Sequence, residues 1–281
     1  MKRRKTPRMQ VIRLCRPAKW VSRDIFSNPS ITNAGPMNTT IDLLRGHRSI
    51  RRFADTPIDS GLLETLIGAA QAAASSSFLQ GVTIIRVTDE GKRQALRGVA
   101  GGQRYVEEAP EFLVFCADLS RSMRCCEMNG GKAAEGLTEQ FIIATVDTAL
   151  YAQNLVVAAE SAGLGTCYIG ALRNDPATVT RILDLPRQVY PVFGMCLGYP
   201  DQDPEVKPRL PLSVVMKENS YHADGEAEAI AAYDEEMRAY YAARTDNQKA
   251  QGWSEQMAGL LGREGRPHML EYLRSQGFIT R

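Results

Sequence analysis

The chain has 281 residues, of which 44% are hydrophobic and 23% charged, a balance typical of a soluble globular protein. Its charge is unevenly placed: residues 1–36 hold nine Lys or Arg against one acid, Asp24, and the remainder holds 25 Lys or Arg against 31 Asp or Glu, a net charge of −6. This acidic body argues against nucleic acid as a partner of the folded part.

The basic leader, residues 1–36, has no apolar run long enough for a secretory signal and is interrupted by prolines at 7, 17, 29 and 36. We interpret it as a disordered tail or the product of an upstream start. A transit peptide, or a basic arm that touches nucleic acid or acidic lipid, is the alternative. Residues 37–281 show no internal repeat and no linker, so we predict one domain there, with a helical excursion at about 222–265.

Helix and strand patterns alternate along residues 37–281. Apolar periodicity and capping residues predict helices at 59–74, 92–99, 135–163, 175–183, 227–244, 253–261 and 267–276. Short β-branched or apolar runs predict strands at 82–87, 112–117, 166–170 and 189–198. The pattern indicates an α+β fold.

The predicted helix 135–163 is apolar around most of its circumference. Glu139, Asp147 and Glu160 interrupt it too often for a membrane span, so no membrane partner is expected. A helix that is apolar all round is buried in a core or at a subunit interface. For one domain of this size we favour a dimer interface.

The six cysteines form no C-x-x-C pair, which favours a reducing compartment and a cytoplasmic protein. Cys116 and Cys196 are expected to be buried within strands, and the adjacent Cys125 and Cys126 to lie in a loop. The three histidines, at 47, 222 and 268, are scattered, so no metal site is expected.

Four segments are candidates for a single site that binds an anionic cofactor. Arginine offers a planar fork to phosphate oxygens, serine adds a neutral donor, and glycine lets the backbone approach a ligand closely. The segments are the basic run 47–51, the serine run 75–77, the strand end 168–173 around Gly170, and Lys207-Pro208-Arg209. Gly163-Leu-Gly165 lacks the third glycine of a dinucleotide fingerprint, and there is no P-loop and no G-x-S-x-G motif.

Taken together, these segments resemble the nitroreductase family, specifically its oxygen-insensitive, NADPH-dependent group A and the related flavin reductases. The resemblance covers residues 37–281. The motifs that carry it are Gly46-His47-Arg48-Ser49-Ile50-Arg51, Ser75-Ser76-Ser77-Phe78-Leu79-Gln80, Gly101-Gly102-Gln103, Ala158-Ala159-Glu160-Ser161, Gly163-Leu-Gly165, Tyr168-Ile169-Gly170, Leu197-Gly198-Tyr199-Pro200, Lys207-Pro208-Arg209-Leu210-Pro211 and Glu218-Asn219-Ser220-Tyr221.

The resemblance implies a central mixed sheet flanked by helices, in an intertwined homodimer with two FMN sites at the subunit interface. By motif, the residues expected to bind FMN are His47, Arg48, Ser49, Ile50, Arg51, Ser75, Ser76, Ser77, Gln103, Tyr168, Ile169, Gly170, Ala171, Lys207, Pro208 and Arg209. Arg244 and Lys249 are expected to bind NADPH, and Ser77, Phe78 and Arg266 to touch the acceptor. Ala171 stands where the family usually has a second glycine.

The function that the resemblance implies is an FMN-dependent NADPH:acceptor oxidoreductase. It would reduce nitroaromatics, quinones and free flavins by two electrons in a ping-pong cycle, with the hydride chemistry on FMN and no catalytic side chain. Two alternatives remain open: an NADPH-dependent FMN reductase that supplies a partner monooxygenase, and a flavin-binding redox sensor without turnover.

Overall fold

The computed structural model describes residues 38–244 and 248–281. The predictions made for the basic leader lie outside the described residues. Within them, the order of helices and strands follows the α+β pattern expected from the sequence.

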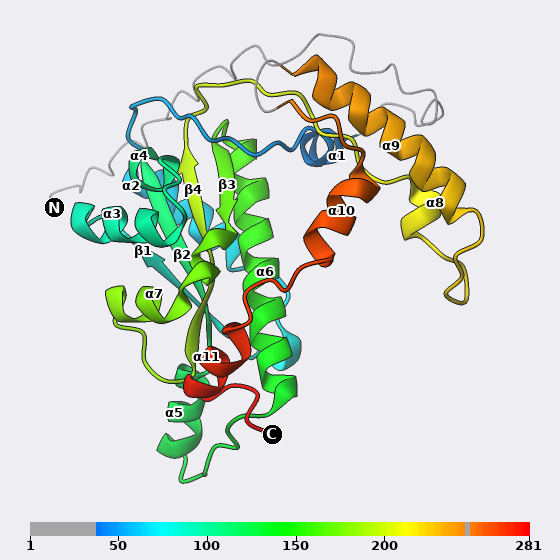
Figure 1. The fold of residues 1–281 in the computed structure, drawn as a ribbon. Helices are drawn as coiled ribbons and strands as arrows, with labels where there is room; N and C mark the ends of the chain where they lie inside the picture. Colours follow the sequence, from blue (N-terminus) through cyan, green and yellow to red (C-terminus); the bar gives the residue numbers. More distant parts are fainter. Residues whose placement is uncertain (1–37, 245–247) are drawn as a thin grey trace, which may run out of the picture.

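A four-stranded sheet forms the centre of the molecule (Figure 1). Its strands are β1 (Val82–Arg86), β2 (Glu111–Asp118), β3 (Gly165–Ile169) and β4 (Val189–Gly198), in the order β1-β2-β4-β3. All three strand pairings are antiparallel. The expectation of a mixed sheet is therefore corrected: among the described residues, the parallel pairing found is the isolated bridge between Ser49 and Thr166.

The helices of the structure include all seven predicted ones, most within a few residues of the expected bounds, and four that were not predicted, Thr39–Arg45, Tyr105–Glu108, Ser120–Met128 and Leu212–Val215. They are α1 (Thr39–Arg45), α2 (Ser60–Ala70), α3 (Glu90–Val99), α4 (Tyr105–Glu108), α5 (Ser120–Met128), α6 (Thr138–Ser161), α7 (Pro176–Ile182), α8 (Leu212–Val215), α9 (Glu226–Ala243), α10 (Trp253–Leu261) and α11 (Met269–Ser275). Short 3-10 turns occupy Ser76–Phe78 and Gly170–Asn174.

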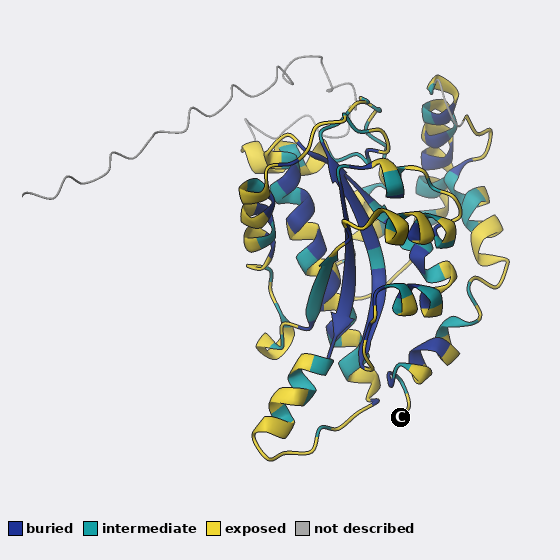
Figure 2. Cartoon of the chain, turned by 90° about the vertical axis from the view of Figure 1, so that its left-hand side faces the viewer, coloured by how far each residue is buried: buried dark blue, intermediate teal, exposed yellow. Residues whose placement is uncertain are grey.

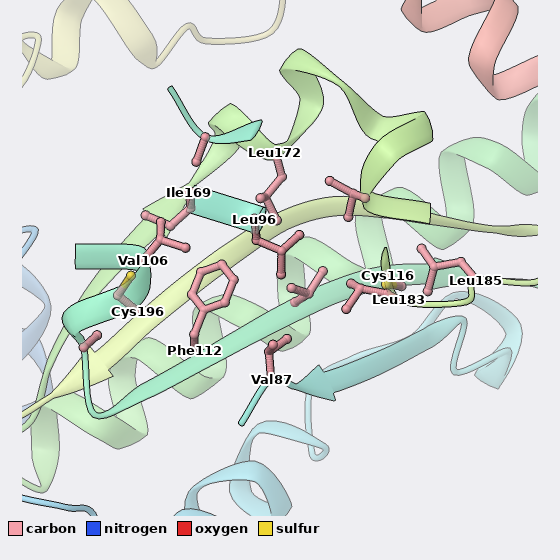
Figure 3. Packing of buried hydrophobic residues seen from close by; sticks show 14 of the residues in the cluster. Val87, Leu96, Val106, Phe112, Cys116, Ile169, Leu172, Leu183, Leu185 and Cys196 are labelled. Carbon is pink, nitrogen blue, oxygen red and sulfur yellow. The ribbon is translucent and has the colours of Figure 1, made fainter. Parts of the chain in front are cut away.

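Both faces of the sheet are covered, so the two central strands are buried along their length (Figure 2). On one face, Phe112, Val114 and Cys196 pack with residues of α3, α4 and α7 (Figure 3). On the other face, side chains of β2 and β4 pack with α2 and α6. The burial of Cys116 and Cys196 confirms the expectation that they act as small core residues.

Two local predictions were wrong for identifiable reasons. Cys125 and Cys126 lie on α5 and not in a loop; the helix has only nine residues, none of them buried. The helix predicted at 59–74 ends at Ala70, because the residues that follow enter a turn held by a buried carboxylate of α6.

Helix α6 is long and apolar enough to cross a membrane by length and composition alone. In the structure it packs against α2 and the sheet, and its Asp147 is buried and hydrogen-bonded to Ser75. Because a helix in a protein core can be equally long and apolar, we do not infer a membrane-spanning helix here.

Candidate functional site

The basic segment leaves α1 and runs beside β3. Ser49 bridges Thr166, and the amide of Ile50 donates to the Thr166 carbonyl at 2.8 Å. The side chain of Ile50 is buried against Gly165, where an added Cβ would lie 2.5 Å from Ile50 Cγ1. The glycine at 165 therefore lets this segment approach β3 closely, with the Ile50 side chain packed against the glycine.

Two polar side chains of the segment have partners from distant parts of the chain. His47 Nδ1 lies 2.6 Å from Glu160 Oε1 at the end of α6. Arg48 Nη1 lies 3.2 Å from Asp203 Oδ1, in the loop that follows β4. The Glu160 contact fixes the orientation of the His47 ring, so the other ring nitrogen, Nε2, points away from α6.

The opposite wall of the site comes from the C-terminal third of the chain. Lys207 and Arg209 lie on the extended segment between β4 and α8. The Tyr233 hydroxyl of α9 donates to the Pro208 carbonyl at 2.9 Å and fixes this segment to the helix. The end of the same helix carries Tyr241.

Between these walls lies an open pocket of about 400 Å³. Its lining residues are His47, Arg48, Ser49, Arg51, Pro204, Glu205, Lys207, Arg209, Tyr240, Tyr241, Arg244 and Lys249. Six of these are Lys or Arg, against one carboxylate. Such an excess of donors and positive charge is suited to phosphate groups.

The serine segment lies outside this pocket. Asp147 is buried on α6 and accepts hydrogen bonds from Ser75 Oγ at 2.6 Å, the Ser76 amide at 3.1 Å and the Gly81 amide at 3.2 Å. Ser77 and Phe78 have positive φ angles of 51° and 57°, and Phe78 is 80% exposed. Hydrogen bonds to Asp147 thus fix the turn on its buried side, and Ser77 and Phe78 are exposed to solvent on the other side.

The other predicted FMN residues lie close to the core and do not line the pocket. Tyr168 packs edge-to-face on Phe193, with ring centroids 5.0 Å apart, and burial raises its pKa well above the usual value. Ile169 is a core residue, and Gly170 and Ala171 begin the 3-10 turn after β3.

Gln103 and Arg266 also lie outside the pocket. Gln103 is half-buried, and its Oε1 is buried without a hydrogen-bond partner among the described residues. Arg266 donates through Nε and Nη2 to Asn174 Oδ1, both at 3.1 Å, near Arg173.

The structure adds residues to which the sequence analysis assigned no role. Tyr240 and Tyr241 line the pocket, Glu160 orients His47, and Asp203 pairs with Arg48. Two features of the sequence could have identified these residues. Glu160 lies within a motif that carried the resemblance, and the two tyrosines lie one helical turn before Arg244. No cluster of three His, Cys, Asp or Glu residues that could hold a metal ion occurs in the part of the chain that the structure describes.

The fold and the pocket together define an α+β protein with a cationic pocket, built where the basic segment meets the C-terminal helices. Two family models match the chain: "Nitroreductase family" over residues 44–199 and "Nitroreductase family, C-terminal domain" over residues 207–281. The chain belongs to the nitroreductase family, which confirms the resemblance seen in the sequence.

Curated relatives and solved structures agree with this assignment. The chain is 47% identical over 245 residues to the oxygen-insensitive NADPH nitroreductase of Salmonella typhimurium, which covers 87% of this chain and 100% of the relative. It is 50% identical over 245 residues to the NADPH-flavin oxidoreductase of Vibrio harveyi, with the same coverage. The structure of nitroreductase A from Vibrio parahaemolyticus superimposes with a TM-score of 0.81 at 48% identity and covers 87% of this chain and 100% of its own.

Proposed function

We propose that this protein is an FMN-dependent NADPH:acceptor oxidoreductase that reduces nitroaromatics, quinones and free flavins. The observation that carries the proposal is the pocket of about 400 Å³ in which six Lys or Arg side chains converge. FMN brings one phosphate and NADPH brings three, and these groups account for that charge. The names of the relatives support both the activity and the cofactor.

The residues present fit FMN. The donor set of Arg48, Ser49 and Arg51, with Lys207 and Arg209 opposite, suits a phosphate dianion and the polar edge of a flavin. Gln103 lies outside this pocket; its buried Oε1, which has no hydrogen-bond partner among residues 38–244 and 248–281, would accept from a ring N–H group.

Bound FMN would supply the redox chemistry, accepting a hydride from NADPH and passing it to the acceptor. The side chains of the protein would bind and orient the cofactor and its substrates. Lys207 and Arg209 would place positive charge near the ring and favour the uptake of electrons. The Glu160 contact holds the His47 ring in a single orientation.

Arg244 and Lys249, which line the pocket, are proposed to bind the 2′-phosphate that distinguishes NADPH from NADH. Arg244→Gln is expected to raise the KM for NADPH about tenfold or more, because it removes a charged hydrogen bond to phosphate, and to leave the KM for NADH unchanged. Steady-state kinetics with both nucleotides measure this. Equal losses with NADH and NADPH would contradict the assignment.

We further propose that the protein is a homodimer in which the serine turn of one subunit completes the FMN site of the other. This accounts for a turn that is held from behind by Asp147 yet presents Ser77 and Phe78 to solvent, away from the pocket of its own chain. In that arrangement, Ser77 and Phe78 would touch the acceptor.

The first experiment is an absorbance spectrum of the purified protein, followed by anaerobic addition of NADPH and then nitrofurazone. Flavin bands that bleach with NADPH and recover with the nitro compound support the proposal. A protein that stays colourless and inert after FMN is supplied contradicts it.

The Vibrio harveyi relative, a flavin oxidoreductase by name, favours a second candidate, an NADPH-dependent FMN reductase that supplies a partner monooxygenase. Comparing kcat/KM for free FMN with that for nitrofurazone distinguishes the two. A strong preference for free FMN identifies the reductase.

The protein is proposed to be cytoplasmic. The described cysteines at 116, 125, 126, 167 and 196 are all free thiols, the state that a reducing compartment maintains.

A further inference from the structure

Tyr241 lines the pocket together with the basic residues of its C-terminal wall. Its side chain is 3% exposed, and three cations approach its ring. Lys207 Nζ and Lys249 Nζ each lie 5.4 Å from the ring centroid, and the Arg244 guanidinium carbon lies 6.0 Å from it. Cations within about 6 Å of a ring centroid are attracted to its π-electrons.

The hydroxyl of Tyr241 is linked to one of these cations, Lys249, through Gln256. The phenol oxygen donates to Gln256 Oε1 at 3.4 Å. Lys249 Nζ donates to the same Gln256 oxygen at 3.2 Å. A single chain of contacts therefore runs from Lys207, through Tyr241 and Gln256, to Lys249.

The electrostatics of Tyr241 agree with this arrangement. Burial opposes ionisation of the phenol, but the nearby ammonium groups of Lys207 and Lys249 outweigh it and lower the pKa of Tyr241. On the same helix, Tyr233 is also buried but shows the reverse: burial, the largest effect, raises its pKa. The contrast indicates that Tyr241 responds to the gathered cations and not merely to its place on α9.

Three positive charges held near one another repel. If nothing ordered the three long side chains, binding of a phosphate would also cost their conformational entropy. We propose that Tyr241 is a positioning residue that holds Lys207, Arg244 and Lys249 together, ready for the phosphate of NADPH. This inference rests on the proposed function and extends it, because the same ring touches the lysine assigned to the flavin and the two cations assigned to NADPH.

Two substitutions separate the ring from the hydroxyl. Tyr241→Phe keeps the ring and breaks the hydrogen-bonded chain, and Tyr241→Leu removes both. Each variant is assayed as the holoenzyme with FMN in excess, with NADPH and with NADH. Binding of NADP⁺ and NAD⁺ is measured by calorimetry.

Tyr272→Phe is the matched control. Tyr272 is buried on α11 and its hydroxyl is hydrogen-bonded to Thr180 at 2.6 Å, so the control also removes one buried hydroxyl, away from the pocket. Melting temperatures of all variants identify any general loss of stability.

We expect Tyr241→Phe to raise the KM for NADPH and the Kd for NADP⁺ about threefold to fivefold, and Tyr241→Leu to raise both about tenfold or more. The KM for NADH and the Kd for NAD⁺ should stay within about twofold, because these nucleotides lack the 2′-phosphate that the gathered cations would bind. Tyr272→Phe should change none of these values.

Two results would overturn the inference: Tyr241→Leu binding NADP⁺ as the wild type does, or losing NADP⁺ and NAD⁺ affinity equally. The Arg244→Gln variant separates this failure from that of the proposed function. If Arg244→Gln discriminates against NADPH and the Tyr241 variants do not, only the role of Tyr241 is wrong. If Arg244→Gln also fails to discriminate, the NADPH site itself is misplaced.

Discussion

At the scale of single residues, Gly165 controls how the basic segment lies on the sheet. A Cβ at this position would meet Ile50 Cγ1 at 2.5 Å and Ile50 Cβ at 2.8 Å. Gly165→Ala is therefore expected to destabilise the protein by about 1–3 kcal/mol through overpacking and to weaken FMN binding, since Arg48 and Ser49 precede the displaced residue. Urea denaturation and FMN titration measure the two effects.

Gly98→Ala is the control for this change. Gly98 lies in α3 and an added Cβ meets nothing within 4 Å. Alanine there should stabilise the helix by about 0.5–1 kcal/mol and leave FMN affinity unchanged. Loss of stability in both variants, or in neither, would show that the contact between Gly165 and Ile50 is not the cause.

The cysteines divide by burial. Burial, with a smaller effect of Asp118, raises the pKa of Cys116 to about 12, and burial also raises the pKa of Cys167 and Cys196. Because the thiolate is the reactive form, these three should resist alkylation in the native protein at pH 8, whereas Cys125 and Cys126 on the exposed helix α5 should react. Peptide-resolved mass spectrometry after iodoacetamide treatment tests this; labelling of Cys196 before unfolding would contradict the core packing.

At the scale of elements, Asp147 connects α6 to the serine turn. It is buried and accepts from Ser75, Ser76 and Gly81. Asp147→Asn keeps the shape but turns an amide group toward hydrogen-bond donors, so we expect a loss of about 1.5–3 kcal/mol in the free energy of unfolding. FMN affinity should fall as well if the turn completes a site.

Asp89→Asn provides the comparison. Asp89 caps α3 in an exposed position and accepts from the Lys92 amide at 2.7 Å, a role that asparagine performs equally well. Its stability should change by less than about 0.5 kcal/mol. If Asp147→Asn is equally mild, the turn is not held by that carboxylate.

At the scale of the whole molecule, an apolar stripe on α6 marks the proposed dimer interface. Ile142, Val146 and Leu150 recur every four residues and are 47%, 49% and 42% exposed. Val146→Asp would bury a charge in this interface and should yield a monomer with weaker FMN binding. Sedimentation velocity gives the oligomeric state. Ala95→Asp, on an exposed position of α3, should remain a dimer; a wild-type monomer would refute the interface.

Local patterns in the sequence were enough to predict most helices and strands, the cationic segments and the family of this protein. Alternating helix and strand signals predicted the four strands and the long helix α6, because burial imposes a periodicity that each element carries by itself. Clusters of Arg, Lys and Ser identified the cationic segments, and their order along the chain indicated the family. Helices α1, α4, α5 and α8 were missed because each is short, and α1, α5 and α8 have no buried residue.

The tertiary structure alone decided which of these segments form one site. It brought the basic run 47–51 to Lys207, Arg209 and the end of α9, and it left the serine run at a separate turn held by Asp147. Pairings of this kind depend on contacts between residues more than 100 positions apart, such as His47 with Glu160. A local pattern indicates whether a side chain is buried. Which residue that side chain contacts depends on how distant parts of the chain fold together.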